Sequence, residues 1–150
     1  MSIKPISRIV LVACLLLAVL GCNSVQPSDL AGSWVITDSS RQILPDGLRN
    51  ASAKIVLSID GSFVASEMPG LFYVPGRRGI RLESGSGGWK LVAREGRQQV
   101  QLDFRAITDW SKTELPYGTQ LDVSNGVSVA KLFYFVGDAD EGQRIEFEKK

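Results

Sequence analysis

The feature that most constrains the fold of this chain is an alternation of apolar and polar residues that extends from Leu30 to the C-terminus. It is clearest over residues 98–105, where every second residue is apolar: Val100, Leu102 and Phe104. A period of two places successive side chains on opposite faces of a β-strand, so that one face packs in a core and the other meets water. The pattern therefore predicts an all-β domain.

Turn signals divide the alternation into short strands. We expect hairpin turns at Asp60-Gly61, Glu95-Gly96 and Asn125-Gly126, since glycine takes the positive φ of a tight turn at little cost. At Asp60-Gly61 the pattern predicts a two-residue type I′ turn, with Ile59 on the inward face of the strand before it. Residues 127–136 are almost continuously apolar, which predicts a buried central strand.

Sequential hairpins favour an antiparallel up-and-down meander of about seven to nine strands. Closing such a meander into a barrel removes the exposed edges of the sheet. The sequence therefore predicts a β-barrel, with a β-sandwich as the alternative architecture.

Residues 67–88 interrupt this pattern. Met68–Pro75 is an apolar cluster associated with two Pro-Gly pairs, and the cations Arg77, Arg78 and Arg81 follow it. Proline cannot donate to a sheet ladder, so we expect a loop or a short edge strand here. The glycines at 85, 87 and 88 predict a flexible turn. An apolar segment left in water is an aggregation hazard, so Met68–Pro75 is expected to cover part of the domain.

The N-terminus has the layout of an export signal. Lys4 and Arg8 precede an unbroken apolar run, residues 9–20, with no acid before or within it. A cationic segment, a short apolar segment and a small residue at the cleavage site are the parts of such a signal. The run is too short to cross a bilayer as a helix, which takes about 20 residues. Val19-Leu20-Gly21-Cys22 resembles the lipobox of bacterial lipoprotein signal peptides, where the cysteine receives a lipid and becomes the mature N-terminus.

This resemblance implies three parts: a signal peptide (1–21), a lipidated N-terminus and tether (22–29), and a β domain (30–150). It also implies a location in the bacterial cell envelope, where the lipid on Cys22 holds the protein to a membrane. In enterobacterial lipoproteins an aspartate after the cysteine marks retention at the inner membrane. Asn23 stands there instead, so we expect the periplasmic face of the outer membrane if the organism is Gram-negative. A cleaved signal without lipid, or a short N-terminal anchor, is the alternative.

Composition excludes several kinds of chemistry. The chain has no histidine, and its two cysteines are Cys14, inside the expected signal peptide, and Cys22. A disulfide in the mature domain is therefore not expected. Removing Lys4 and Arg8 from 17 cations leaves 15 against 16 acids, a side-chain charge of −1. A near-neutral domain has no field that attracts nucleic acid.

A catalytic centre needs a tuned base, a nucleophile or a metal. Without histidine or a free thiol, the remaining options are carboxylate pairs, Ser-Lys pairs and tyrosines. The acids Asp60, Asp138, Asp140 and Glu141 all lie in expected turns, where carboxylates are commonly solvated. Residues 138–142 lack the ligand spacing of an EF-hand calcium loop. We therefore expect no enzyme activity, no metal site and no cofactor.

Gly32-Ser33-Trp34 opens the first expected strand, and the meander that follows it resembles the lipocalin and calycin group. In that group the Gly-x-Trp tryptophan plugs the closed end of an eight-stranded barrel, and an arginine near the last strand often stacks on it. Arg144 is a candidate for that arginine. The resemblance implies a barrel that either encloses a small ligand or is filled with its own side chains.

Two functions follow from these expectations. The first is a non-enzymatic, lipid-anchored envelope protein that binds a small apolar or amphipathic ligand, with Met68–Pro75 folded over the barrel mouth. Its candidate ligand-binding residues are the expected inward aromatics, three apolar residues of that segment and two arginines at the rim: Trp34, Phe63, Leu71, Phe72, Tyr73, Arg77, Arg78, Trp89, Phe104 and Tyr134. The alternative is a filled barrel that acts by protein contact, as an accessory subunit or an inhibitor of an envelope or host enzyme.

Overall fold

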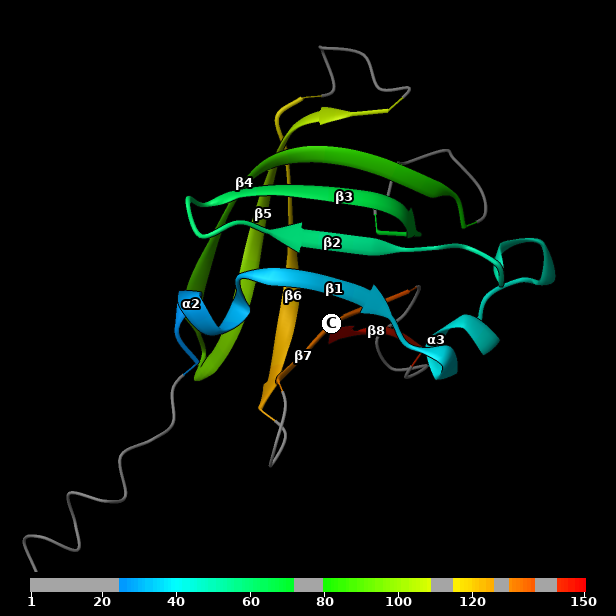
Figure 1. Ribbon diagram of the computed structural model, residues 1–150, viewed down its shortest axis with the longest axis horizontal. Helices are drawn as coiled ribbons and strands as arrows, with labels where there is room; N and C mark the ends of the chain where they lie inside the picture. The colour runs from blue at the N-terminus through cyan, green and yellow to red at the C-terminus, as the bar shows by residue number, and fades with distance from the viewer. Residues whose placement is uncertain (1–24, 72–79, 109–114, 126–129, 137–142) are drawn as a thin grey trace, which may run out of the picture.

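The computed structural model describes residues 25–71, 80–108, 115–125, 130–136 and 143–150. Within these ranges the chain forms an antiparallel barrel in which each strand pairs with its neighbours in sequence (Figure 1). Its strands are β1 (Gly32–Ile36), β2 (Lys54–Leu57), β3 (Ser62–Pro69), β4 (Leu82–Arg94), β5 (Arg97–Ile107), β6 (Tyr117–Asn125), β7 (Ala130–Phe135) and β8 (Arg144–Lys149). The predicted all-β meander is confirmed.

Pairing between the first and last strands closes the barrel. Trp34 of β1 lies opposite Lys149 of β8, and Ile36 lies opposite Phe147. Because this ladder joins the two ends of the meander into one continuous sheet, the predicted barrel is confirmed and the β-sandwich alternative is wrong.

Short helical segments flank β1. Helix α2 (Pro27–Leu30) precedes it, while α3 (Asp38–Gln42) and the 3₁₀ turn η1 (Asp46–Leu48) lie between β1 and β2. Among the described residues, no helix is long and apolar enough to cross a membrane. In Figure 1, α2 and α3 lie at opposite ends of β1, so we refer to the α2 end and the α3 end of the barrel.

The alternating apolar residues face the barrel interior. Gln101 and Asp103 of β5 point outward while Leu102 and Phe104 between them are buried, as the sequence pattern predicts. Phe63 and Phe104 pack edge to face at the centre of the barrel, with ring centroids 4.7 Å apart. Such a pair contributes beyond the apolar area that it buries.

The glycines of β4 were expected in a turn, and that expectation is wrong. Gly85, Gly87 and Gly88 lie within a strand that pairs with β3 on one side and β5 on the other. The β4–β5 register shifts between Ser86 and Gly87. A β-carbon on Gly87 would lie only 2.0 Å from the carbonyl oxygen of Asp103. Glycine is therefore needed for the close approach of β5 at this bulge.

Two of the predicted hairpin turns lie where the sequence places them, and one of these differs in register; Gly126 of the third, at Asn125-Gly126, lies outside the described residues. Glu95 and Gly96 both have positive φ, 51° and 76°, as a two-residue type I′ turn requires. The β2–β3 turn is longer than predicted, because the amide of Gly61 donates to the carbonyl of Ser58 (3.0 Å). Ile59 therefore lies in the turn and is 72% exposed, so its predicted inward position is wrong.

Strand β7 is buried on only one face, contrary to the central strand predicted for this region. Leu132 and Tyr134 point into the core, while Phe133 and Phe135 form an edge-to-face pair on the outer surface, with centroids 5.8 Å apart. Residues 127–129 of the predicted strand lie outside the described residues. The sequence of β7 is therefore apolar on both faces because its outer face carries the aromatic residues Phe133 and Phe135.

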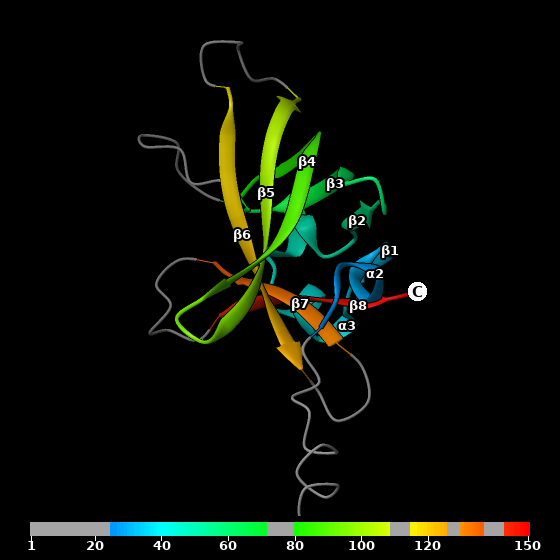
Figure 2. The ribbon, with the colours of Figure 1, turned by 90° about the vertical axis from the view of Figure 1, so that its left-hand side faces the viewer.

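Strands β6 and β7 diverge. Their ladder extends only from Asp122 opposite Phe133 to Asn125 opposite Ala130. Figure 2 shows β6 running upright beside β5 while β7 crosses it steeply. Between Tyr117 and Leu121, the described residues therefore place a neighbouring strand on only one side of β6, where β5 pairs with it.

Candidate functional site

The barrel interior is the first place to look for a binding site. Trp34 and Phe104 are 0% exposed and Phe63 is 1% exposed, while Trp89 and Tyr134 are also buried. A side chain that lines a void large enough for water has surface that water can reach. These five aromatic residues have almost none, since each is 7% exposed or less.

Trp34 closes the α2 end of the barrel. Its indole Nε1 donates to the carbonyl oxygen of Leu30 at 2.7 Å, which attaches helix α2 across the opening. The ammonium nitrogen of Lys149 lies 6.0 Å from the centre of the indole ring and donates to the carbonyl of Asp29 at 2.7 Å. A cation at this distance is attracted to the face of the ring.

Lys149 thus lies beside Trp34, where the resemblance to the lipocalin and calycin group implies an arginine. Arg144 was the candidate for this role, and that assignment is wrong because its guanidinium lies over Phe133, 5.1 Å from the ring centre. Gly32 has a φ of +136°, a backbone conformation that favours glycine, and the flexible end of the Lys149 side chain lies beside it.

Two further contacts complete the α2 end. The side-chain amide of Gln98 accepts from the backbone N–H of Val25 (3.0 Å) and donates to the carbonyl of the same residue (2.8 Å). Trp89 Nε1 donates to the carbonyl of Ser58 at 2.8 Å, which holds the β2–β3 turn over the barrel. The Gln98 side chain therefore holds Val25 against β5.

At the α3 end, the start of the apolar segment joins the core. Met68 and Leu71 are buried, and the hydroxyl of Tyr134 donates to the carbonyl of Pro69 at 2.7 Å. Burial raises the pKa of Tyr134 well above its ordinary value, so the hydroxyl stays protonated. Of the two predicted forms, a loop or a short edge strand, the segment up to Pro69 takes the strand form, as the last part of β3, where Met68 and Pro69 pair with β4. The candidates Phe72, Tyr73, Arg77 and Arg78 lie outside the described residues, as does Cys22.

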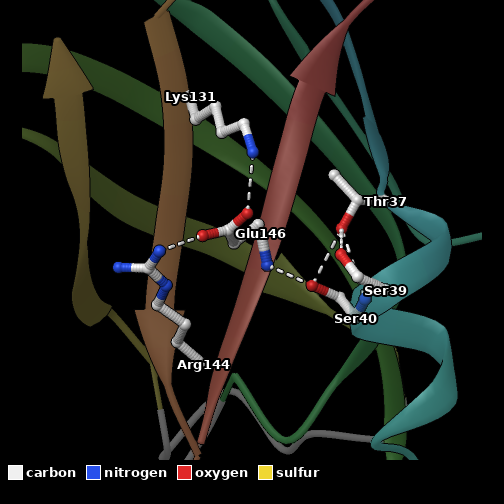
Figure 3. A network of polar contacts seen from close by, with 6 residues as sticks. All are labelled: Thr37, Ser39, Ser40, Lys131, Arg144 and Glu146. Atoms are coloured by element: carbon white, nitrogen blue, oxygen red, sulfur yellow. Dashed lines mark hydrogen bonds and ion pairs between the residues drawn. The ribbon is translucent and has the colours of Figure 1, made fainter. Parts of the chain in front are cut away.

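A polar network connects α3 to the last strand (Figure 3). The carboxylate of Glu146, whose side chain is 12% exposed, pairs with Lys131 at 3.0 Å and with Arg144. Its backbone N–H donates to Ser40 Oγ at 2.8 Å. Thr37 caps α3 by accepting from the Ser40 amide at 3.3 Å. The network therefore fixes α3 against the outer face of β8.

The charge state of Glu146 follows from these partners. Partial burial alone raises the pKa of the carboxyl, but the hydrogen bond from Lys131 and the charge of Arg144 outweigh it and lower the pKa below its ordinary value. The carboxylate is thus ionised and neutralised by two cations. Such a group serves structure better than proton transfer, which needs a pKa near the working pH.

The described residues contain no group of three or more potential metal-ligating side chains. The acids at 138, 140 and 141 considered for a calcium loop lie outside these residues. What the described surface can do is make contacts, through outward aromatics, backbone groups and charged side chains.

Comparison with known proteins found no matching family model, no matching curated protein and no matching solved structure. The lipocalin-like arrangement of this chain therefore rests on its own strand order, register and closed α2 end.

Proposed function

We propose that this chain is a lipid-anchored protein of the bacterial envelope whose barrel is filled and which acts by contact with another protein. The observation that carries this proposal is the burial of the interior aromatics. Trp34, Phe63 and Phe104 are the residues best placed to line a ligand cavity, and they leave almost no surface for a ligand to touch. This favours protein contact over the binding of a small apolar ligand.

The proposed anchor is a lipid on Cys22, supported by the lipobox resemblance. One acyl chain gives only marginal membrane binding and several give a stable attachment, at about 0.8 kcal/mol per buried methylene. Gln98 fixes Val25 to the barrel, so only a short stretch of chain separates the cysteine from the packed domain. At about 3.3–3.6 Å per residue, this stretch reaches roughly 10 Å.

This short connection gives the barrel an orientation. The α2 end must lie against the membrane surface, and the α3 end must point away from it. The strands then extend away from the membrane surface. Their outer faces are not covered by the membrane, so neighbouring envelope proteins can reach them.

A substitution of the anchor tests the first half of the proposal. Cys22→Ser should move the protein from the membrane pellet to the soluble envelope fraction after a high-salt wash. Cys14→Ser is the matched control, because it removes the other thiol within the expected signal peptide and should leave the protein in the pellet. Retention of the Cys22→Ser protein in the membrane would exclude the lipid anchor.

The released Cys22→Ser protein also tests the second half. Titration with a fluorescent fatty-acid analogue should give no saturable uptake, since the inward aromatics leave almost no surface for an acyl chain to touch. Saturable uptake of one analogue per protein would instead support the ligand-binding function.

A further inference from the structure

The turn between β2 and β3 (residues 58–61) presents an apolar side chain to solvent at the α2 end of the barrel. Ile59 is 72% exposed, the largest exposed fraction among the large hydrophobic residues that the structure describes. Turns of this kind usually carry polar residues or glycine. One exposed isoleucine needs no explanation by itself. Its significance depends on what lies opposite this end of the barrel.

Hydrogen bonds to β4 hold this turn in place. The carbonyl oxygen of Ser58 accepts from the Gly61 amide at 3.0 Å and from Trp89 Nε1 at 2.8 Å. The carbonyl oxygen of Gly61 accepts from the amide of Trp89 at 2.7 Å. Because the Trp89 side chain is buried, the turn is tied to the packed barrel and keeps Ile59 on the outside.

Two other elements lie at the same end as this turn. Gly32, which follows α2, pairs with Leu57, which precedes the turn. The hairpin that joins β4 to β5 (residues 90–99) belongs to this end as well, because Gln98 binds Val25 just before α2. Figure 1 shows the turn, α2 and the hairpin along the left-hand margin of the barrel. One flat surface placed against that margin can therefore touch all three.

The charged side chains of this end have both signs. Arg94 and Arg97 form the last rung of the β4–β5 hairpin, and both are exposed. Lys131, at the start of β7, is paired with Glu146. The other cations of this end and its acids are Lys90, Lys149 and Lys150, and Asp29, Asp60, Glu95 and Asp122. Such a mixture suits a layer of zwitterionic lipids, in which each headgroup carries a phosphate and an ammonium group.

The chain before Val25 indicates what covers this end. The proposed lipid on Cys22 and the residue that Gln98 binds are separated by a stretch that reaches roughly 10 Å. A bilayer that holds the lipid therefore approaches the α2 end of the barrel and no other face. An isoleucine exposed at that end leaves water when it meets the apolar side of the headgroup layer, and this transfer is favourable.

We propose that the α2 end is a membrane-contact surface for a zwitterionic phospholipid layer. Ile59 enters the boundary between headgroups and acyl chains, and the guanidinium groups of Arg94 and Arg97 meet lipid phosphates, which their fork of donors fits. This inference rests on the proposed lipid anchor and adds a second point of contact, which fixes the orientation of the barrel on its tether. One isoleucine has far less apolar surface than an acyl chain, so Cys22→Ser should still release the protein.

The test measures the depth of two isoleucine positions in a bilayer. Under the proposed processing the mature chain has no free thiol, because Cys14 is removed and Cys22 carries the lipid. Ile59→Cys and Ile43→Cys, each made in the full chain, therefore take one nitroxide label. Ile43 is the matched control, since it is 47% exposed and follows α3 at the opposite end of the barrel. Circular dichroism of each labelled protein checks that the fold is intact.

The lipidated proteins are reconstituted in phosphatidylcholine vesicles. Collisions of the label with oxygen, which concentrates in the bilayer, are compared with collisions with a nickel chelate, which stays in water. The label at position 59 should report a depth of about 5–10 Å in the headgroup boundary, as interfacial apolar side chains do. The label at position 43 should stay in water. In soluble Cys22→Ser protein without vesicles, the label at position 59 should be in water as well.

Three results would overturn the inference and leave the anchor standing. The label at position 59 could stay in water on a lipidated chain, or positions 59 and 43 could be protected equally, which would mean that the barrel has no fixed orientation. Protection of position 59 in the soluble protein would show that a second copy of the chain covers it. Mass spectrometry separates these results from failure of the anchor, because two labels per chain would reveal a free Cys22 thiol and overturn both proposals.

Discussion

Glycine residues show how single positions in this chain depend on contacts that local sequence does not reveal. Gly85, Gly87 and Gly88 have the spacing of a turn, and nothing in their neighbours in sequence distinguishes a turn from a bulge. The requirement for glycine comes from β5, whose Asp103 carbonyl occupies the space of a Gly87 side chain. Sequence can therefore predict that these positions are unusual, but only the packed sheet shows why.

We predict that Gly87→Ala destabilises the barrel by about 1–3 kcal/mol or more, because the bulge must shift to admit a methyl group. Gly47→Ala is the control, since a β-carbon at Gly47 would meet nothing within 4 Å. That variant should have unchanged or slightly raised stability. Urea unfolding of the two variants provides the comparison, and equal midpoints would show that β4 and β5 are not so closely apposed.

Leu102 and Gln101 test the alternation itself. Leu102 is fully buried, so Leu102→Ala should cost about 2–5 kcal/mol in the free energy of unfolding. Gln101 points outward and loses only a hydrogen bond to Asp103, so Gln101→Ala should cost less than about 1 kcal/mol. A larger loss for Gln101 than for Leu102 in chemical denaturation would reverse the assigned faces of β5.

Glu146 predicts a dependence of stability on pH. Its pKa is lower in the folded protein than the ordinary value of about 4.3. Its stabilising contribution is therefore fully present above that value and is lost as pH falls through the lower, folded pKa. We expect the stability difference between wild type and Glu146→Gln to shrink as pH falls below about 4.3. A difference that stayed constant from neutral to strongly acidic pH would contradict the ion-paired state.

At the level of secondary structure, the sequence predicted strands better than helices. The alternation over 98–105 identifies the centre of β5, and Glu95-Gly96 identifies the turn before it. Helices α2 and α3, of 4 and 5 residues, are too short to show an apolar period. One local signal for α3 is present in the sequence: Thr37 is a residue type that favours the N-cap position of a helix. In the structure its hydroxyl oxygen accepts a hydrogen bond from the Ser40 amide.

The attachment of α2 was not predictable, because Gln98 is one polar residue among several on β5. We expect Gln98→Ala to release Val25 and to speed hydrogen exchange at the Ala31 amide, which donates to the Pro27 carbonyl in α2. Each lost hydrogen bond is worth about 1 kcal/mol. Gln101→Ala provides the control on the same strand. Unchanged exchange at Ala31 would mean that α2 is held by Trp34 and Lys149 without help from Gln98.

For the whole molecule, the local sequence pattern does not decide whether the sheet closes into a barrel. The meander fits a barrel or a sandwich equally well until β1 pairs with β8, a contact between the two ends of the domain. Closure also determines how much interior space the inward side chains must fill. In this barrel the inward positions include large aromatics that are buried, among them Trp34, Phe63 and Phe104.

The most direct test of this account is native mass spectrometry of the wild-type protein purified from its own membrane. The account predicts one species whose mass corresponds to residues 22–150 with lipid attached to Cys22. It also predicts that no further small molecule is retained at the mildest ionisation that keeps the fold. A stoichiometric apolar ligand that dissociates on activation would contradict the filled barrel, and an unlipidated polypeptide would contradict the anchor.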